Sequence, residues 1–99
     1  MDKAIYKFFT VRFLEAWYQL SEEEQNSLEG KLDTALEKVG AKRLILCDSR
    51  WSTDEWAFAG VEEFPNMEAV QKYMAALNEL DWFRYVEGRN VLGTKLESE

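Results

Sequence analysis

Two amphipathic helical segments, each flanked by strand-like segments, constrain the fold of this chain more than any other feature. Residues 21–24, Ser-Glu-Glu-Glu, have the form of a capping box, which predicts that a helix begins there. Its apolar residues recur at helical spacing until Gly40, a residue suited to the left-handed position that ends a helix. A second helix is predicted after Asn66, a good N-cap, with an apolar stripe that reaches Leu77.

The segments around these helices read as four strands, over residues 4–13, 41–50, 55–64 and 89–96. Residues 4–13 carry apolar side chains at both odd and even positions, which is typical of a central strand buried on both faces. Two successive strand-helix-strand units predict an α+β, ferredoxin-like βαββαβ fold. Such a fold has a four-stranded antiparallel sheet with two helices on one face, and the whole chain, residues 1–99, forms this single domain.

The second and third strands are expected to form a hairpin, because only a few polar residues, Ser52, Thr53 and Asp54, lie between them. A turn over Ser52–Glu55 would pair Trp51 with Trp56, Ser49 with Phe58 and Cys47 with Gly60. In this register the helices would cover a face made of Leu44, Leu46, Ala57, Ala59 and Val61. The opposite, open face would carry Ile45, Cys47, Trp51, Trp56 and Phe58.

An open face of this kind requires a cover. Monomeric proteins rarely expose more than about 300–600 Å² of contiguous apolar surface, and three large aromatic residues with their apolar neighbours would exceed that area. The chain contains no third helix to place there, so the simplest cover is the same face of a second copy about a two-fold axis. The sequence therefore predicts a homodimer.

Charge and cysteine content exclude several partners and compartments. The formal net charge of -7 repels phosphate backbones and anionic headgroups, so neither nucleic acid nor a membrane is expected as a partner. Cys47 is the only cysteine, and the start of the chain lacks the apolar stretch of about 7–15 residues found in signal peptides. A cytoplasmic location is the expectation.

The absence of histidine is the strongest constraint on chemistry. It removes histidine-ligated haem, the common nitrogen-ligated metal sites and the usual general base at neutral pH. The five glycines do not form a phosphate-binding loop, and adjacent Glu62 and Glu63 would project to opposite faces of a strand. We therefore expect no metal and no cofactor.

Residues 17–24, Trp-Tyr-Gln-Leu-Ser-Glu-Glu-Glu, and residues 64–69, Phe-Pro-Asn-Met-Glu-Ala, precede and open the two predicted helices. Together with the order of elements, they resemble the dimeric α/β-barrel superfamily, nearest to uncharacterised darcynin-like proteins. The resemblance implies the fold and the dimer. The superfamily includes cofactor-independent monooxygenases, haem-binding enzymes, lactone isomerases and YciI-like proteins, several of which rely on a histidine.

Four tryptophans in 99 residues are out of proportion and allow two interpretations. They can pack in the core and the dimer, or line an apolar cavity with a few placed polar groups. For the cavity, the candidate ligand-binding residues are Tyr6, Arg12, Arg50, Trp51, Trp56 and Phe58. Either arginine would anchor an acidic group, unless it only pairs with a neighbouring Asp48 or Asp54.

Three functions follow from these interpretations. The first is a protein that binds a small apolar or aromatic molecule in an aromatic-lined cavity of a dimeric α/β barrel. The second is a non-catalytic homodimeric interaction module, which would have a filled interior without a cavity above about 300 Å³. The third, suggested by the resemblance, is an enzyme similar to the cofactor-independent monooxygenases.

Overall fold

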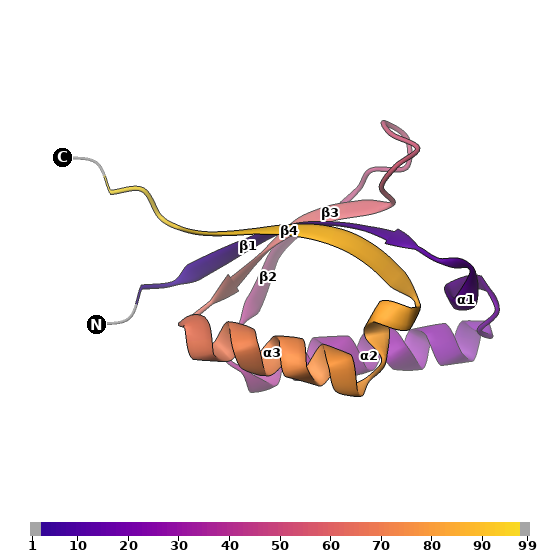
Figure 1. Ribbon diagram of the computed structural model, residues 1–99, viewed down its shortest axis with the longest axis horizontal. Coiled ribbons are helices and arrows are strands. Elements are labelled where there is room, and N and C mark those ends of the chain that lie inside the picture. Colours follow the sequence, from indigo (N-terminus) through magenta and orange to yellow (C-terminus); the bar gives the residue numbers. More distant parts are fainter. Residues whose placement is uncertain (1–2, 98–99) are drawn as a thin grey trace.

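The computed structural model describes residues 3–97 and has the predicted order of elements (Figure 1). The strands are β1 (Ile5–Phe13), β2 (Lys42–Asp48), β3 (Phe58–Phe64) and β4 (Val86–Thr94). The long helices are α2 (Glu22–Lys38) and α3 (Met67–Glu79), and two short ones are α1 (Glu15–Tyr18) and the 3-10 helix η1 (Trp82–Arg84). The ferredoxin-like βαββαβ fold is confirmed.

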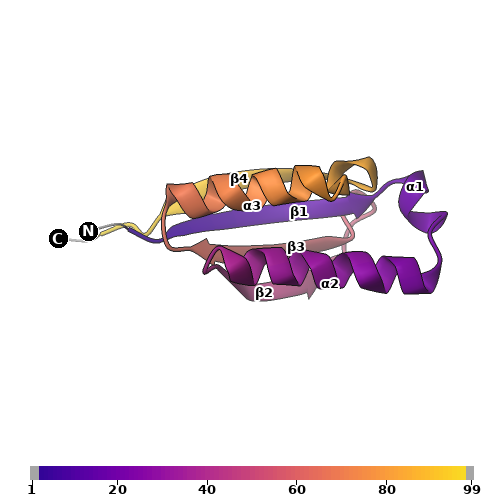
Figure 2. The same ribbon diagram turned by 90° about the horizontal axis from the view of Figure 1, so that it is seen from below.

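The four strands form one antiparallel sheet in the order β2-β3-β1-β4. Helices α2 and α3 lie side by side on one face of this sheet, and within residues 3–97 no helix lies on the other face (Figures 1 and 2). Strand β1 is interior, paired with β3 and β4, as predicted for a central strand. Its side chains on the helix-free face are not buried within the single chain, since Phe8 is half exposed.

Local signals place the helix boundaries where the sequence predicts them. The Ser21 hydroxyl accepts a hydrogen bond from the Glu24 backbone N–H, and the Glu24 carboxylate accepts one from the Ser21 backbone N–H, which completes the capping box. Gly40 has a φ of 77°, the left-handed conformation that favours glycine. The Asn66 side chain caps α3 by accepting from the Ala69 N–H.

The hydrophobic core lies between the two helices and the sheet. Its centre is Phe64 of β3, which is fully buried against Tyr73 of α3 at a ring-centroid distance of 5.6 Å. Leu32 and Leu36 of α2 and Leu77 of α3 belong to the same buried cluster. The apolar stripes of both helices therefore face the sheet, as their spacing predicts.

The predicted hairpin register is wrong by one residue. Strand β2 ends at Asp48 and β3 begins at Phe58, so the connection covers residues 49–57 and rises on the side away from the helices (Figure 1). The Ser49 carbonyl accepts from the N–H groups of Ser52 and Thr53, which turns the chain earlier than expected. A register irregularity between Arg43 and Ile45 then adds to the shift.

This shift changes which residues share a face. Phe58 pairs with Asp48, Ala59 with Cys47, and Val61 with Ile45. Because a slip of one residue exchanges the faces of a strand, Phe58 points toward the helices, whereas Ala59 and Val61 lie on the open face. The predicted placement of these three residues is therefore corrected, while Leu46 and Ile45 keep their assigned faces.

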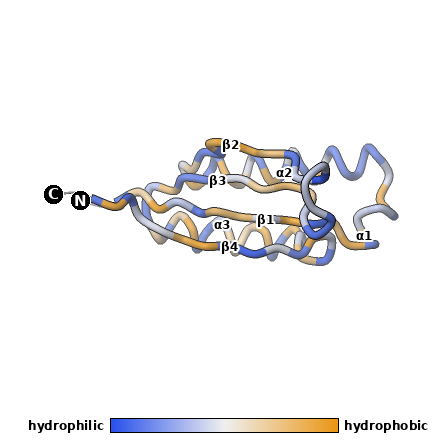
Figure 3. The backbone as a smooth tube through the Cα atoms, turned by 90° about the horizontal axis from the view of Figure 1, so that it is seen from above, coloured by the Kyte–Doolittle hydropathy of each residue, from blue (hydrophilic) through white to orange (hydrophobic). Residues whose placement is uncertain are grey.

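The open face carries one apolar row across all four strands, Ile45–Val61–Phe8–Val91, defined by direct cross-strand pairs. Figure 3 views the sheet from this side and shows the strand order. Polar pairs flank the row: Tyr6 donates a hydrogen bond to Glu63, and Arg12 forms an ion pair with Glu87. The open face is thus mainly aliphatic rather than built on tryptophan.

The remaining differences concern the chain after β1 and after α3. Helix α1 was not predicted; it places Trp17 under the end of the sheet, where this side chain is buried. The short helical turn predicted near Trp82 is present as η1. Strand β4 begins at Val86, three residues before the predicted start at Arg89, because Val86 is buried beside Phe13 of β1.

Candidate functional site

A row of alternating charges crosses the helix-covered face of the sheet. Arg43 of β2 pairs with Glu62 of β3, and Glu62 pairs with Lys7 of β1. The three side chains therefore point to the same side, under the helices. Lys7 and Glu62 are the two buried charged residues of the described chain, at 7% and 3% exposure. Such residues are rarely buried unless paired, so their position needs an explanation.

The carboxylate of Glu62 is shared unequally between the two cations. Arg43 donates to Glu62 Oε2 from Nε at 3.2 Å, and its Nη1 donates to Asp33 of α2 at 2.9 Å. The Lys7 ammonium lies 3.6 Å from Glu62 Oε1, longer than the about 2.7–2.9 Å of a strong charge-assisted hydrogen bond. Glu62 is thus held mainly by Arg43, and Lys7 is only loosely paired.

Aromatic rings complete the surroundings of Lys7. Its Nζ lies 5.3 Å from the ring centroid of Tyr73 and 5.8 Å from that of Phe9. Burial lowers the pKa of Lys7, Arg43 lowers it further, and the attraction of Glu62 acts in the opposite direction. Burial and the Glu62 charge raise the pKa of Tyr73, which keeps its hydroxyl protonated.

Next to the charged row, the same face becomes aromatic. Phe9 lies against Gly60, where a Cβ would come within 2.7 Å of the Phe9 ring, so only glycine leaves room for it. Further along, Phe13 contacts Phe58 edge to face at 5.8 Å between centroids and stacks on Trp17 at 4.7 Å. The face therefore has a charged end and an aromatic end.

These two ends line a cavity of about 380 Å³ between the sheet and the helices. The charged end is formed by Lys7, Arg43, Glu62 and Tyr73, and the walls include Phe9, Val11, Phe13, Phe58, Leu77, Trp82 and Val86. The cavity meets solvent at its exposed lining residues, which are Glu29, Asp33, Leu46, Phe83, Gly88 and Asn90. An apolar cavity with a few polar groups at one end is the usual form of a small-molecule site.

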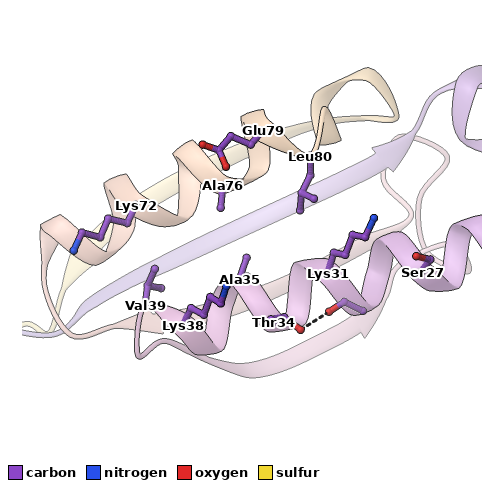
Figure 4. A pocket seen from close by; sticks show the side chains of 11 residues that line it. Ser27, Lys31, Thr34, Ala35, Lys38, Val39, Lys72, Ala76, Glu79 and Leu80 are labelled. Carbon is purple, nitrogen blue, oxygen red and sulfur yellow. Dashed lines mark hydrogen bonds between the residues drawn. The ribbon is translucent and has the colours of Figure 1, made fainter.

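A larger hollow of about 570 Å³ lies on the outside, between α2 and α3 (Figure 4). Small or apolar residues such as Ala35, Ala76 and Leu80 form its floor, and Lys31, Lys38, Lys72 and Glu79 stand at its edges. Its charged side chains are exposed and free to solvate, in contrast with Lys7 and Glu62. We therefore place the candidate site between sheet and helices.

The six residues predicted from sequence do not converge on one place. Phe58 lines the cavity, and the Arg50 guanidinium carbon lies 5.4 Å from its ring centroid. Arg50 is itself bound to Asp48 by two side-chain hydrogen bonds, of 3.0 and 2.8 Å, which hold the pKa of that carboxyl at about 2. This is the aspartate pairing considered above as the alternative to a ligand anchor.

The other predicted residues lie outside the cavity. Arg12 stacks over Trp56 at 5.6 Å and pairs with Glu87 at 2.7 Å. Tyr6 donates its hydroxyl to Glu63 at 3.0 Å, and this hydrogen bond raises the pKa of Tyr6. Trp51 projects from the β2–β3 connection and is 85% exposed. These four residues belong to the open face or the loop rather than to the cavity.

Sequence reasoning did not identify four residues at the charged end of this cavity, which are Lys7, Arg43, Glu62 and Tyr73. The signal for Lys7 was present: it is the one charged residue inside the otherwise apolar run Ile5–Phe9. An interior strand of a sheet rarely carries an unpaired lysine, so a buried acid on a neighbouring strand could have been sought. Its identification as Glu62 required the register of β1 against β3.

Haem ligation does not fit this cavity. The chain has no histidine, and the cavity lining contains neither cysteine nor methionine. Tyr73 is the one tyrosine of the lining, and its raised pKa disfavours the phenolate that would bind iron. Among residues 3–97, no group of three or more His, Cys, Asp or Glu side chains is placed to hold a metal ion.

Comparison with solved structures shows the fold. Chlorite dismutase from Candidatus Nitrospira defluvii, in complex with imidazole, superposes with a TM-score of 0.77 at 12% identity, over all of this chain and 43% of that one. A substituted form of the same enzyme gives a TM-score of 0.77 over 99% of this chain. A protein of unknown function from Rhodopseudomonas palustris gives 0.71 at 15% identity, over 99% and 86% of the two chains.

These likenesses extend to the fold alone, because the identities are low. The chain spans less than half the length of the chlorite dismutase chains that it matches. No protein-family model matches the sequence, and no curated protein matches it either. The chain shares the ferredoxin-like βαββαβ fold with these structures. Across residues 3–97, no helix combines the length and apolar character needed to cross a membrane.

Proposed function

We propose that this protein binds a small apolar or aromatic molecule in the cavity between the sheet and helices α2 and α3. The observation that carries this proposal is the loosely paired, buried Lys7 at one end of a cavity whose other end is aromatic. Phe58, Phe13 and Trp82 would contact the apolar body of the ligand. Lys7 and Arg43 would contact its polar end.

The size of the cavity supports binding over a purely structural role. Its volume of about 380 Å³ lies within the range of about 300–1,000 Å³ found for ligand sites. A non-catalytic interaction module would have its interior filled. A buried ammonium without a close acceptor also costs stability, and a ligand oxygen would supply that acceptor.

The proposal includes a homodimer formed through the open face. The row Ile45–Val61–Phe8–Val91 supports it, because three of these four apolar side chains are exposed in the single chain. A second copy about a two-fold axis would cover the row with its own equivalent. The darcynin-like proteins, whose helix starts resemble Trp17–Glu24 and Phe64–Ala69, are the proposed nearest relatives.

Tryptophan fluorescence tests the ligand proposal, because Trp82 lines the cavity and Trp56 does not. We would titrate the protein with aromatic acids, aromatic aldehydes, quinones and fatty acids. At least one class should give a saturable change that Trp82→Phe removes and Trp56→Phe retains. No response from any class, or a response removed only by Trp56→Phe, would contradict the proposal.

A further inference from the structure

Lys7 has the surroundings of a reactive amine rather than of a plain structural cation. Its side chain is 9% exposed, and the part that remains accessible borders the cavity. The Arg43 guanidinium binds the same carboxylate at 3.2 Å and so reduces the share of Glu62 charge available to Lys7. Lysines become nucleophilic when they are desolvated or placed near another cation. Lys7 is desolvated by burial and lies in the same cross-strand row as Arg43.

We propose that Lys7 forms a reversible imine with a small aromatic or apolar aldehyde or ketone bound in this cavity. The inference rests on the proposed function and names the ligand class of the same site. The aromatic walls would hold the body of the molecule, with its carbonyl carbon at the charged end. Apolar walls also limit access of water, which would return the imine to the amine.

Formation of the imine requires neither an oxidant nor a reductant. The neutral amine of Lys7 adds to the carbonyl carbon, the electron pair of the C=O bond goes to oxygen, and one nitrogen-bound proton is transferred to that oxygen to give a neutral carbinolamine. The hydroxyl then takes up a second proton and leaves as water while the nitrogen lone pair forms the C=N bond, and loss of the remaining nitrogen-bound proton gives the neutral imine. Glu62 Oε1, 3.6 Å from Nζ, is the group placed to accept and return these protons.

The other charged groups around Nζ are consistent with this assignment. Arg43 lies on β2, Tyr73 on α3, and Asp33 and Glu29 line the cavity from α2. Arg43 and Asp33 bind each other at 2.9 Å, which leaves Glu62 as the acid nearest to Lys7. Tyr73, kept protonated, offers a hydroxyl rather than a second negative charge.

Reductive trapping tests the imine directly. The intact protein would be incubated with benzaldehyde and sodium cyanoborohydride, which reduces an imine to a stable secondary amine, and each of the seven lysines would be scored by peptide mass spectrometry. We expect Lys7 to be labelled faster than all six others, although it is the most buried lysine. Lys7→Arg, which keeps the charge, should lose that label, and Lys42→Arg on exposed β2 should leave it unchanged.

A competition experiment distinguishes labelling of Lys7 by an aldehyde bound in the cavity from labelling that any lysine would undergo in solution. Benzyl alcohol, which has the aromatic ring without the carbonyl, should slow labelling of Lys7 and leave that of Lys42 unaffected. If aromatic molecules bind but Lys7 is labelled no faster than exposed lysines, the imine proposal is overturned and the binding proposal stands. If nothing binds and Lys7 is not labelled, both fail.

Discussion

The two faces of the sheet are formed by the same strands but carry different side chains. Adjacent residues of β2 show this: Leu46 lines the cavity under the helices, and Ile45 belongs to the apolar row on the open face. They are almost equally exposed, at 52% and 54%. The helix-covered face contains buried charges and a cavity, whereas the open face carries an exposed apolar row. This difference supports the two proposals, that the covered face binds a ligand and that the open face binds a second copy.

The largest effect should come from the charged row of the covered face. Glu62→Gln leaves Lys7 and Arg43 without their shared carboxylate, and breaking a buried pair in this way costs about 3–5 kcal/mol. We expect a loss of this size in the free energy of unfolding by urea. The neighbouring Glu63→Gln on the open face should cost much less, because its side chain accepts one hydrogen bond, from Tyr6, and the amide oxygen of glutamine can still accept it. Equal losses of unfolding free energy in Glu62→Gln and Glu63→Gln would contradict the greater importance of the charged row on the covered face.

A charge on the open face should break the dimer. Ile45→Glu places an unpaired carboxylate in the proposed interface, so we expect the dimer dissociation constant to rise about 100-fold, equivalent to about 2.8 kcal/mol. Leu46→Glu should leave it unchanged. Analytical ultracentrifugation at several concentrations measures both. A wild-type protein that is monomeric throughout would contradict the interface.

The pH dependence of stability should show a smaller effect on the covered face. Burial lowers the pKa of Lys7 below its ordinary 10.5, against the attraction of Glu62, with Arg43, Tyr73, Asp33 and Glu29 also nearby. The folded protein therefore loses this proton before the unfolded chain does, and stability rises with pH in the window below 10.5.

Comparison with Lys7→Met isolates this contribution. The difference in unfolding free energy between wild type and Lys7→Met should shift in favour of wild type as pH rises from about 8 to 9.5, before unfolded tyrosines ionise. Urea melts across this range give the slope. A flat or opposite slope would show that burial does not disfavour the charged form of Lys7.

Features that depend on interactions within a few residues could be predicted from the sequence, and features that depend on distant residues could not. The capping box at Ser21, the cap at Asn66 and the left-handed Gly40 act within a few residues, so both long helices could be predicted closely. The hairpin register could not, because it depends on hydrogen bonds within residues 49–57 and on an irregularity in β2.

The six candidate ligand-binding residues were chosen with the incorrect register, and the structure does not bring them together. With Phe58 assigned to the open face, the aromatic residues appeared to gather there, and the candidate anchors were Arg12 and Arg50. The row Arg43–Glu62–Lys7 emerges only when three strands are aligned. An aromatic-lined cavity could still be predicted from the sequence, because four tryptophans in 99 residues are more than usual.

Isothermal titration calorimetry of two matched variants tests most directly whether the ligand binds on the helix-covered face of the sheet. The titrant would be the tightest compound found by fluorescence. Leu46→Trp should narrow the cavity mouth and weaken binding at least tenfold, about 1.4 kcal/mol, whereas Ile45→Trp should leave affinity unchanged. Weakened binding by Ile45→Trp with unchanged binding by Leu46→Trp would place the ligand on the open face and contradict the account.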